Sequence, residues 1–212
     1  MLRLLKFLTL ASLAMSSVTL AATLLPRSFL EARNAALQIV VSESGKTVAF
    51  CSGAQVALPG GSKIVSAGHC VEGFKSTAKM WGIDARGRKW RLTLESWEKA
   101  WPKNDYATFK PLKSLPSLPV CLEAPSVGEA LYSWSGPEGL ALFPLSGMYL
   151  GAVGDPDPQK GLEGMMLSSQ NAAGGASGSA VLTGKGCVIG ILVGGFSPSI
   201  KLDGALIVPL PQ

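Results

Sequence analysis

The stretch VSAGHC, residues 65–70, contains the only histidine of this 212-residue chain, His69. A second stretch, GGASGS at residues 174–179, carries Ser177 between small residues. A serine hydroxyl becomes a strong nucleophile only when a neighbouring base accepts its proton, so any serine–histidine chemistry in this chain depends on His69. The two stretches therefore predict a hydrolytic site with Ser177 as nucleophile and His69 as base.

The order of these residues along the chain separates the known arrangements of this chemistry. The α/β-hydrolase order places histidine last, whereas no histidine follows Ser177, and Ser179 stands where a G-x-S-x-G elbow has its second glycine. The subtilisin order requires an aspartate before the histidine, and none precedes His69. The order that remains is histidine, aspartate, serine.

Four aspartates lie between the two candidates: Asp84, Asp105, Asp155 and Asp157. Asp84 belongs to the turn-like GIDARG, and Asp155 and Asp157 belong to the loop-like GDPDP. Asp105 opens the apolar stretch DYATF, which can hold a carboxylate at a strand edge, shielded from water. We therefore expect Asp105 to orient the histidine.

Three segments resemble sequence boxes of the trypsin/chymotrypsin-like serine peptidases. VSAGHC resembles the TAAHC box, DYATFK at 105–110 resembles D-I-A-L-L, and GASGSA at 175–180 resembles GDSGGP. A fourth segment, GILVGG at 190–195, is similar to the strand that follows the nucleophile and lines the primary specificity pocket. The resemblance covers residues 36–210.

The resemblance implies a serine endopeptidase that works through an acyl-enzyme intermediate. Its catalytic residues would be His69, Asp105 and Ser177, and the backbone N–H groups of Gly175 and Ser177 would form the oxyanion hole. Such an enzyme needs no metal and no organic cofactor. Its partner is a protein or peptide substrate.

The resemblance also implies a neutral, roomy substrate pocket. Asn171 would lie near its base, and Gly195 and Gly204 would leave its walls open.

Two departures from the family pattern are informative. Ala176 replaces the aspartate that pairs with a freed N-terminal amine in digestive members, so that activation route is not expected. Val193 replaces a serine that supports the catalytic aspartate in many relatives, which predicts one hydrogen bond fewer to Asp105. The motif style is closer to bacterial high-temperature-requirement proteases and RNA-virus chymotrypsin-like proteases.

The expected fold class is all-β, with two six-stranded antiparallel β-barrels of chymotrypsin-like type and the active site in the cleft between them. The Pro-rich residues 111–119 read as a connector. Residues 36–119 would then form the N-terminal barrel with connector, carrying His69 and Asp105, and residues 120–212 the C-terminal barrel carrying Ser177. Helix is expected only locally, around residues 30–36. Short apolar or alternating runs predict strands at residues 37–41, 48–58, 63–66, 89–94, 106–109, 130–134, 141–149, 165–168, 180–183, 188–193 and 205–208.

The N-terminal segment, residues 1–25, has the pattern of a targeting sequence. Arg3 and Lys6 precede the uncharged run 7–25. This pattern predicts export, as a secreted or periplasmic protein after cleavage. If the segment is retained as a signal anchor, the protein would contact the membrane.

Cysteine usage agrees with an exported protein. The four cysteines, Cys51, Cys70, Cys121 and Cys187, allow three pairings, and none has the close spacing of a zinc site. The resemblance favours a bridge between Cys51 and Cys70. Cys121 and Cys187 would form a second bridge or remain free and buried.

Charge gives little support for an acidic partner. The net charge is +5, and residues 86–91 hold the only real basic cluster, which reads as a solvated surface, so no nucleic acid is expected. Two other classes stay open: a catalytically inactive protease-like binding module, and an exported structural or adhesive β protein.

Overall fold

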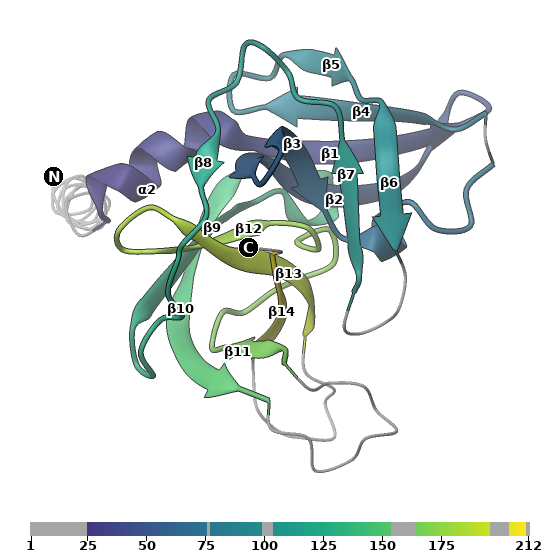
Figure 1. The fold of residues 1–212 in the computed structure, drawn as a ribbon. Helices are drawn as coiled ribbons and strands as arrows, with labels where there is room; N and C mark the ends of the chain where they lie inside the picture. Colours follow the sequence, from purple (N-terminus) through teal and green to yellow (C-terminus); the bar gives the residue numbers. More distant parts are fainter. Residues whose placement is uncertain (1–24, 76, 99–103, 154–163, 196–203, 211–212) are drawn as a thin grey trace, which may run out of the picture.

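The computed structural model describes residues 25–75, 77–98, 104–153, 164–195 and 204–210. The predicted targeting segment lies outside these residues, apart from Leu25. Within the described ranges, no helix combines the length and apolar character needed to cross a membrane. The chain forms two β-sheets that pack against each other (Figure 1).

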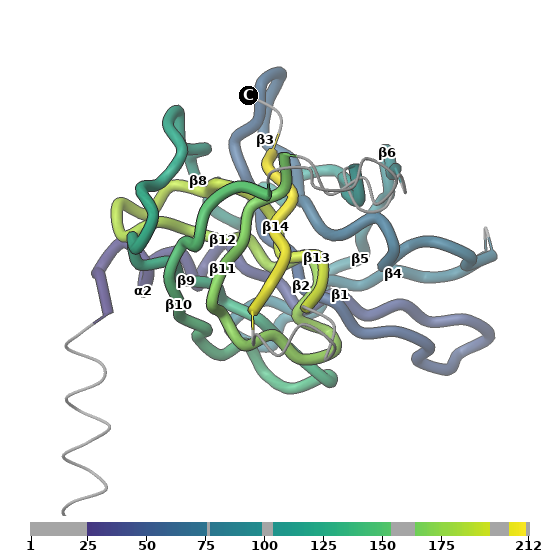
Figure 2. Tube along the Cα trace, turned by 90° about the horizontal axis from the view of Figure 1, so that it is seen from below, coloured from purple at the N-terminus to yellow at the C-terminus, as the bar shows by residue number. Residues whose placement is uncertain are grey.

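The first sheet contains eight strands and curls without closing. Its hydrogen-bonded order is β5-β4-β1-β2-β3-β7-β6, and the short β8 pairs with β2. Figure 2 shows this sheet and the second one from below. The strands are β1 (Ala36–Glu43), β2 (Lys46–Leu58), β3 (Gly61–Ser66), β4 (Lys79–Asp84), β5 (Lys89–Arg91), β6 (Leu94–Glu98), β7 (Tyr106–Phe109) and β8 (Leu118–Pro119).

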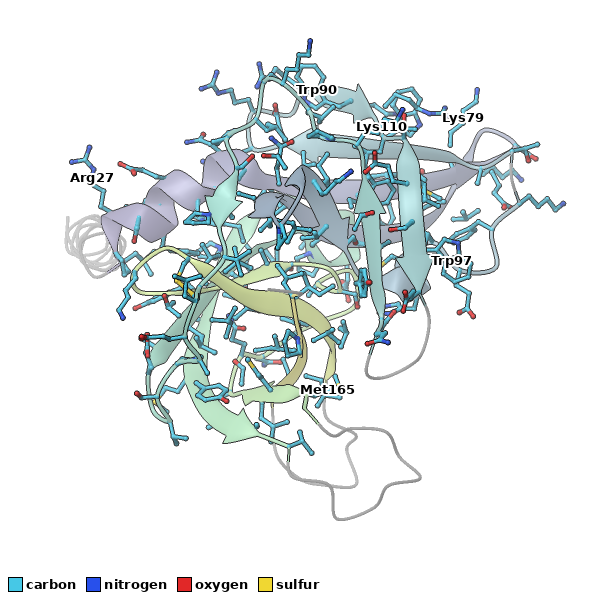
Figure 3. All side chains as sticks on the ribbon, viewed as in Figure 1. Arg27, Lys79, Trp90, Trp97, Lys110 and Met165 are labelled. Atoms are coloured by element: carbon cyan, nitrogen blue, oxygen red, sulfur yellow. A yellow bond between two sulfur atoms is a disulfide. The ribbon has the colours of Figure 1, made fainter. Side chains whose placement is uncertain are left out.

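The second sheet is a closed six-stranded barrel with the order β10-β11-β14-β13-β12-β9. Every pairing in it is antiparallel. Met165 is fully buried beside β11, whereas Lys79 of the first sheet points outward (Figure 3). The strands are β9 (Ala130–Ser135), β10 (Phe143–Ala152), β11 (Met166–Ser168), β12 (Ala180–Thr183), β13 (Val188–Gly195) and β14 (Ala205–Pro209).

The expected all-β, chymotrypsin-like fold class is confirmed. The structure differs from the expectation in the form of the first sheet. Here the two end strands, β5 and β6, do not pair, so the sheet is a curled half-barrel rather than a closed six-stranded barrel. Both ends are strands with little buried surface, since none of their side chains is fully buried. Burial of side chains therefore contributes little to any pairing of β5 with β6.

The helical segment begins earlier than expected. Helix α2 (Arg27–Ala32) follows Pro26 and continues into the 3-10 turn η1 (Arg33–Ala35), and strand β1 starts at once. Proline is favoured at a helix start because its missing N–H would have no partner there. Phe29 stacks on Trp134 at 4.9 Å between ring centroids, and the Trp134 indole N–H donates to the Phe29 carbonyl at 2.7 Å, which fixes α2 on β9.

One apolar core crosses the boundary between the sheets. It joins residues of both, among them Leu37 and Ile39 of β1 and Ile191 of β13. Farther along the chain, Val120 forms a bridge with Val188, and the adjacent disulfide Cys121–Cys187 ties the start of the second half to β13. Both bridges expected from the sequence are present, since Cys51 is bonded to Cys70.

We expect the double substitution of Cys51 and Cys70 by alanine to lower the free energy of unfolding by about 3 kcal/mol, because the bridge closes a loop in the unfolded chain. The two cysteines are 19 residues apart. Urea unfolding under non-reducing conditions measures the difference. A loss below about 1 kcal/mol would contradict this estimate.

Candidate active site

His69 lies in a short 3-10 turn, η2 (Gly68–Cys70), that follows strand β3. The next residue, Cys70, is bonded to Cys51 of β2, so the turn is held covalently to the neighbouring strand. The side chain of His69 keeps 32% of its surface exposed. A base held in this way is fixed at its backbone and still open to a reactant.

Asp105 is placed opposite this turn by strand register. Strand β7 pairs with β3 so that Ala107 faces Ser66, and the antiparallel register carried two residues further sets Asp105 opposite Gly68. The Asp105 carboxylate is fully buried. One oxygen accepts the His69 backbone N–H at 2.7 Å, and the other lies 2.5 Å from His69 Nδ1. The carboxylate therefore fixes both the backbone and the ring of His69.

The competing aspartate Asp84 is engaged elsewhere. Its oxygens accept the backbone N–H groups of Arg86 and Arg88, the Arg88 guanidinium at 2.7 Å and the Trp90 indole N–H at 3.2 Å. Burial alone would raise the pKa of Asp84, but the hydrogen bonds from Arg88, Trp90 and Arg86 hold its pKa below the ordinary value. Asp155 and Asp157 lie outside the described residues.

Asp84→Asn is expected to lower the free energy of unfolding by about 2 kcal/mol at pH 7, because it removes charge-assisted hydrogen bonds to a buried carboxylate. A carboxylate whose pKa is depressed by folding stabilises the fold above its unfolded pKa and loses that effect as pH falls through the folded pKa. The difference should therefore shrink below about pH 4.

Urea unfolding of the wild type and Asp84→Asn at pH 7 and pH 3 measures this change. The control is Glu95→Gln, which breaks the partly exposed ion pair with Lys63 and should cost less than about 1 kcal/mol. An Asp84→Asn difference that is equal at both pH values would contradict the prediction.

Ser177 lies in a loop that docks on strand β2 of the first sheet. Its carbonyl oxygen accepts the Ser52 backbone N–H at 2.8 Å and lies 3.9 Å from the Cys70 sulfur. Cys70 directly follows His69, so the structure brings the serine loop of the barrel beside the histidine turn of the half-barrel. Ser177 itself is partly buried.

Glycine is required beside the serine on both sides. Gly178 has φ +88°, and a Cβ atom there would overlap the Ser52 carbonyl oxygen. Gly175 also has φ +88°, and a Cβ atom there would lie 2.7 Å from the Glu138 nitrogen. The close docking of the loop thus explains part of the GGASGS pattern.

The peptide groups of this loop have fixed directions. The Gly174 carbonyl accepts the Glu138 backbone N–H at 2.7 Å, and the Ala176 carbonyl accepts the Ser179 backbone N–H at 3.1 Å. In a trans peptide the C=O and the following N–H point in opposite directions, so the N–H groups of Gly175 and Ser177 point away from these partners. Neither N–H has a backbone acceptor in the described part of the chain.

Two of the three predicted pocket residues, Gly195 and Gly204, lie close together. Gly195 is exposed and Gly204 is buried, and a Cβ atom at Gly195 would lie 3.5 Å from the Gly204 carbonyl oxygen. Asn171 is exposed, three residues beyond the end of β11. The described residues therefore place the two glycines side by side.

Val193 is buried in the core, at 2% exposure, and its hydrocarbon side chain cannot donate a hydrogen bond. The two hydrogen bonds to the Asp105 carboxylate described above both involve His69, one through its backbone N–H and one through Nδ1.

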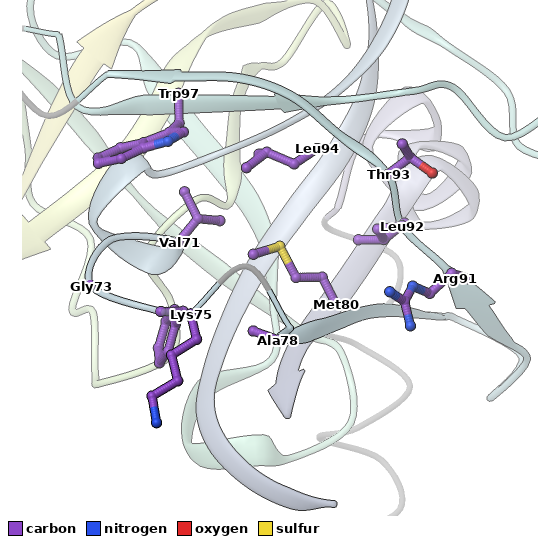
Figure 4. Close-up of a pocket in the computed structure, with 11 residues that line it drawn as sticks. Val71, Gly73, Lys75, Ala78, Met80, Arg91, Leu92, Thr93, Leu94 and Trp97 are labelled. Atoms are coloured by element: carbon purple, nitrogen blue, oxygen red, sulfur yellow. The ribbon is translucent and has the colours of Figure 1, made fainter. Parts of the chain in front are cut away.

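A cavity of about 460 Å³ opens in the half-barrel near the histidine turn (Figure 4). Val71 and Lys75, which follow His69, line one side, and Met80, Arg91 and Trp97 line others. The cavity lies between the unpaired ends of the curled sheet, at β4, β5 and β6.

Ser52 and Ser179 also contact the Ser177 loop, and the sequence did not identify them as site residues. Each hydroxyl is bonded to a carbonyl of that loop, Ser52 to Gly175 and Ser179 to Ala176. Ser179 was noted in the sequence only because it departs from a G-x-S-x-G elbow. Ser52 had no sequence signal, because its partner is 123 positions away.

Comparison with known proteins agrees with this geometry. The model of the trypsin-like peptidase domain matches residues 49–191. No curated protein sequence matches the chain.

Solved structures show the same fold at low sequence identity. The inactive form of a serine-to-alanine mutant of Rv3671c from M. tuberculosis H37Rv has a TM-score of 0.69 and 15% identity, with 87% of this chain and 85% of that chain covered. The serine endoprotease from Yersinia pestis has a TM-score of 0.68 and 17% identity, with 86% of this chain covered. The present chain spans 61% of the Yersinia chain.

Proposed function

Because the chain belongs to the trypsin-like peptidase domain family, we propose that it is a serine endopeptidase that hydrolyses peptide bonds with His69, Asp105 and Ser177. The observation that carries the proposal is the pair of His69 and the fully buried Asp105, next to which the Ser177 loop docks. A buried carboxylate bonded to Nδ1 leaves Nε2 of the same ring as the base.

In the proposed reaction, Ser177 Oγ attacks the peptide carbonyl carbon while His69 Nε2 accepts the hydroxyl proton. His69 then gives this proton to the leaving amine as the C–N bond breaks, which leaves an acyl-enzyme ester on Ser177. Water, activated by the same histidine, hydrolyses the ester and releases the carboxylate product. Asp105 keeps the ring oriented and stabilises its protonated form.

The backbone N–H groups of Gly175 and Ser177 are proposed to bind the oxyanion of each tetrahedral intermediate. Their support is the direction imposed on them by the hydrogen-bonded carbonyls of Gly174 and Ala176. Each such donor contributes about 10²–10³ in rate in enzymes of this kind.

The proposed substrate is a protein or peptide, and Gly195 and Gly204 would form an open, neutral part of its pocket, with Asn171 near the base. We propose that the protein works outside the cytoplasm, as a secreted or periplasmic enzyme, or anchored to the membrane if the N-terminal segment is retained. Two disulfides support this location, since such bonds persist in oxidising compartments.

Hydrolysis of casein in water enriched in oxygen-18 tests the proposal. An endopeptidase cuts internal bonds and incorporates the label into each new carboxyl terminus, which mass spectrometry detects. Fragments should form with the wild type and be absent with Ser177→Ala. Binding of casein without any labelled fragment would support an inactive, protease-like binding module and overturn the proposal.

A further inference from the structure

The hydroxyl of Ser52 links the half-barrel to two loops of the barrel. Ser52 is fully buried on β2. Its hydroxyl accepts the Gly136 backbone N–H at 3.0 Å and donates to the Gly175 carbonyl at 2.9 Å. Its backbone N–H donates to the Ser177 carbonyl at 2.8 Å. Ser52 therefore holds the loop on both sides of Ala176.

Ser179 holds the remaining carbonyl of the same loop. It too is fully buried, and its hydroxyl donates to the Ala176 carbonyl at 2.7 Å. With the Glu138 N–H on Gly174, all four successive carbonyls of residues 174–177 have hydrogen-bond partners. A peptide flip that turned the N–H of Gly175 or Ser177 away would break at least one of these bonds in a buried place.

An ion pair at position 176 cannot hold the loop of residues 174–177 in this conformation. Ala176 is fully buried in an apolar cluster that includes Leu131, Val181, Ile189 and Leu192. An amine inserted there would be a buried charge without a carboxylate partner, which is strongly unfavourable. The neutral hydroxyl groups of Ser52 and Ser179 hold the loop instead, and they need no cleavage of the chain to form their bonds.

We infer that Ser52 and Ser179 are positioning residues that hold the loop of residues 174–177 in its oxyanion-binding conformation without proteolytic processing of the chain. This inference rests on the proposed peptidase function, and it concerns how that site is regulated: the loop is formed by folding alone. Neither hydroxyl touches the substrate in this account. Each acts by fixing the direction of a backbone N–H.

Steady-state hydrolysis of a peptide amide by Ser52→Ala and Ser179→Ala tests the role of the hydroxyls. Each substitution should lower kcat by about 10- to 100-fold, less than the complete loss of an oxyanion donor, because the loop still visits the productive conformation. KM should change by less than about 2-fold, since the bonds matter for the transition state more than for binding. Affinity for a peptide boronic acid, whose adduct is tetrahedral, should fall by the same factor as kcat.

Thr183→Val is the matched control, because it removes a buried hydroxyl of the barrel that bonds to the Lys185 backbone N–H. Its kcat should stay within about 2-fold of the wild type. Circular dichroism melting identifies any variant that is unfolded at the assay temperature. Because Ser52 and Ser179 are two independent positions, one of them still tests the inference if the other variant does not fold.

The second arm compares the form that begins at residue 26 with the form that retains residues 1–25. Equal kcat in both supports the inference. Activity confined to the shorter form, or wild-type kcat in both serine variants, would overturn it while the peptidase proposal stands. A wild type that neither hydrolyses peptides nor reacts with a serine-directed probe would overturn the peptidase proposal, and this inference with it.

Discussion

Ser177→Ala is expected to lower kcat for peptide hydrolysis by about 10⁴- to 10⁶-fold, because no acyl-enzyme can form without the hydroxyl. The residual rate would come from the oxyanion donors and from substrate binding alone. The fold should remain intact, since the loop is held by backbone groups of Ser177 and by its neighbours rather than by the lost hydroxyl. Steady-state kinetics with a fluorogenic peptide measures the loss.

Ser117→Ala is the control for this substitution. Its hydroxyl bonds to Ser62 in the first half of the chain, and its loss should change kcat by less than about 2-fold. Equal activity of Ser177→Ala and the wild type would assign the nucleophile to another residue.

Asp105→Asn is expected to lower kcat by about 10⁴-fold while leaving KM close to that of the wild type. An amide at this position would present an N–H toward His69 Nδ1, which selects the tautomer whose Nε2 carries the proton and cannot act as a base. The effect is large because both oxygens of Asp105 are committed to His69 and the carboxylate has no exposure to water.

Asp84→Asn is the matched control for Asp105→Asn, because it makes the same chemical change in a carboxylate that accepts hydrogen bonds from Arg86, Arg88 and Trp90. It should alter stability and leave kcat within about 2-fold of the wild type. Similar kcat losses in both variants would mean that Asp105 acts through general stability and not through His69.

The pairing of His69 with Asp105 could be predicted from the sequence because it depends on local strand ends. The VSAGHC and DYATF segments each place their polar residue beside an apolar strand, and the register of β3 on β7 then brings the two residues together. Apolar strand segments of this kind can be recognised in a single sequence. The disulfide beside His69 was expected from the family resemblance, and the structure contains it.

Strands β4 and β6 were missed because their patterns are weak. Strand β6 is mostly exposed, and β4 combines Lys79, Trp81 and Gly82 within six residues. They form through pairing with β7 and β1, which no local pattern contains. The strand expected over 89–94 is in fact β5, a two-residue interruption at Leu92 and Thr93, and the start of β6.

The hydrogen bonds from the Ser52 and Ser179 hydroxyls to the Ser177 loop were not predicted from the sequence, and for Ser52 the reason is that its contact depends on how the two sheets dock. Ser52 and Gly175 belong to different halves of the chain, 123 positions apart, and a buried serine in a strand has no signal of its own. The open form of the half-barrel was likewise not predicted, because it depends on whether the end strands β5 and β6 pair with each other.

The most direct test of the central claim is labelling of the chain from residue 26 onward with a fluorophosphonate probe, followed by mass spectrometry of the labelled peptide. Activated serine nucleophiles react with this probe, whereas ordinary serines do not. We expect a single modification at Ser177 that is lost in His69→Ala as well as in Ser177→Ala. Folded wild-type protein that takes up no label, or label that persists in His69→Ala at the wild-type rate, would contradict it.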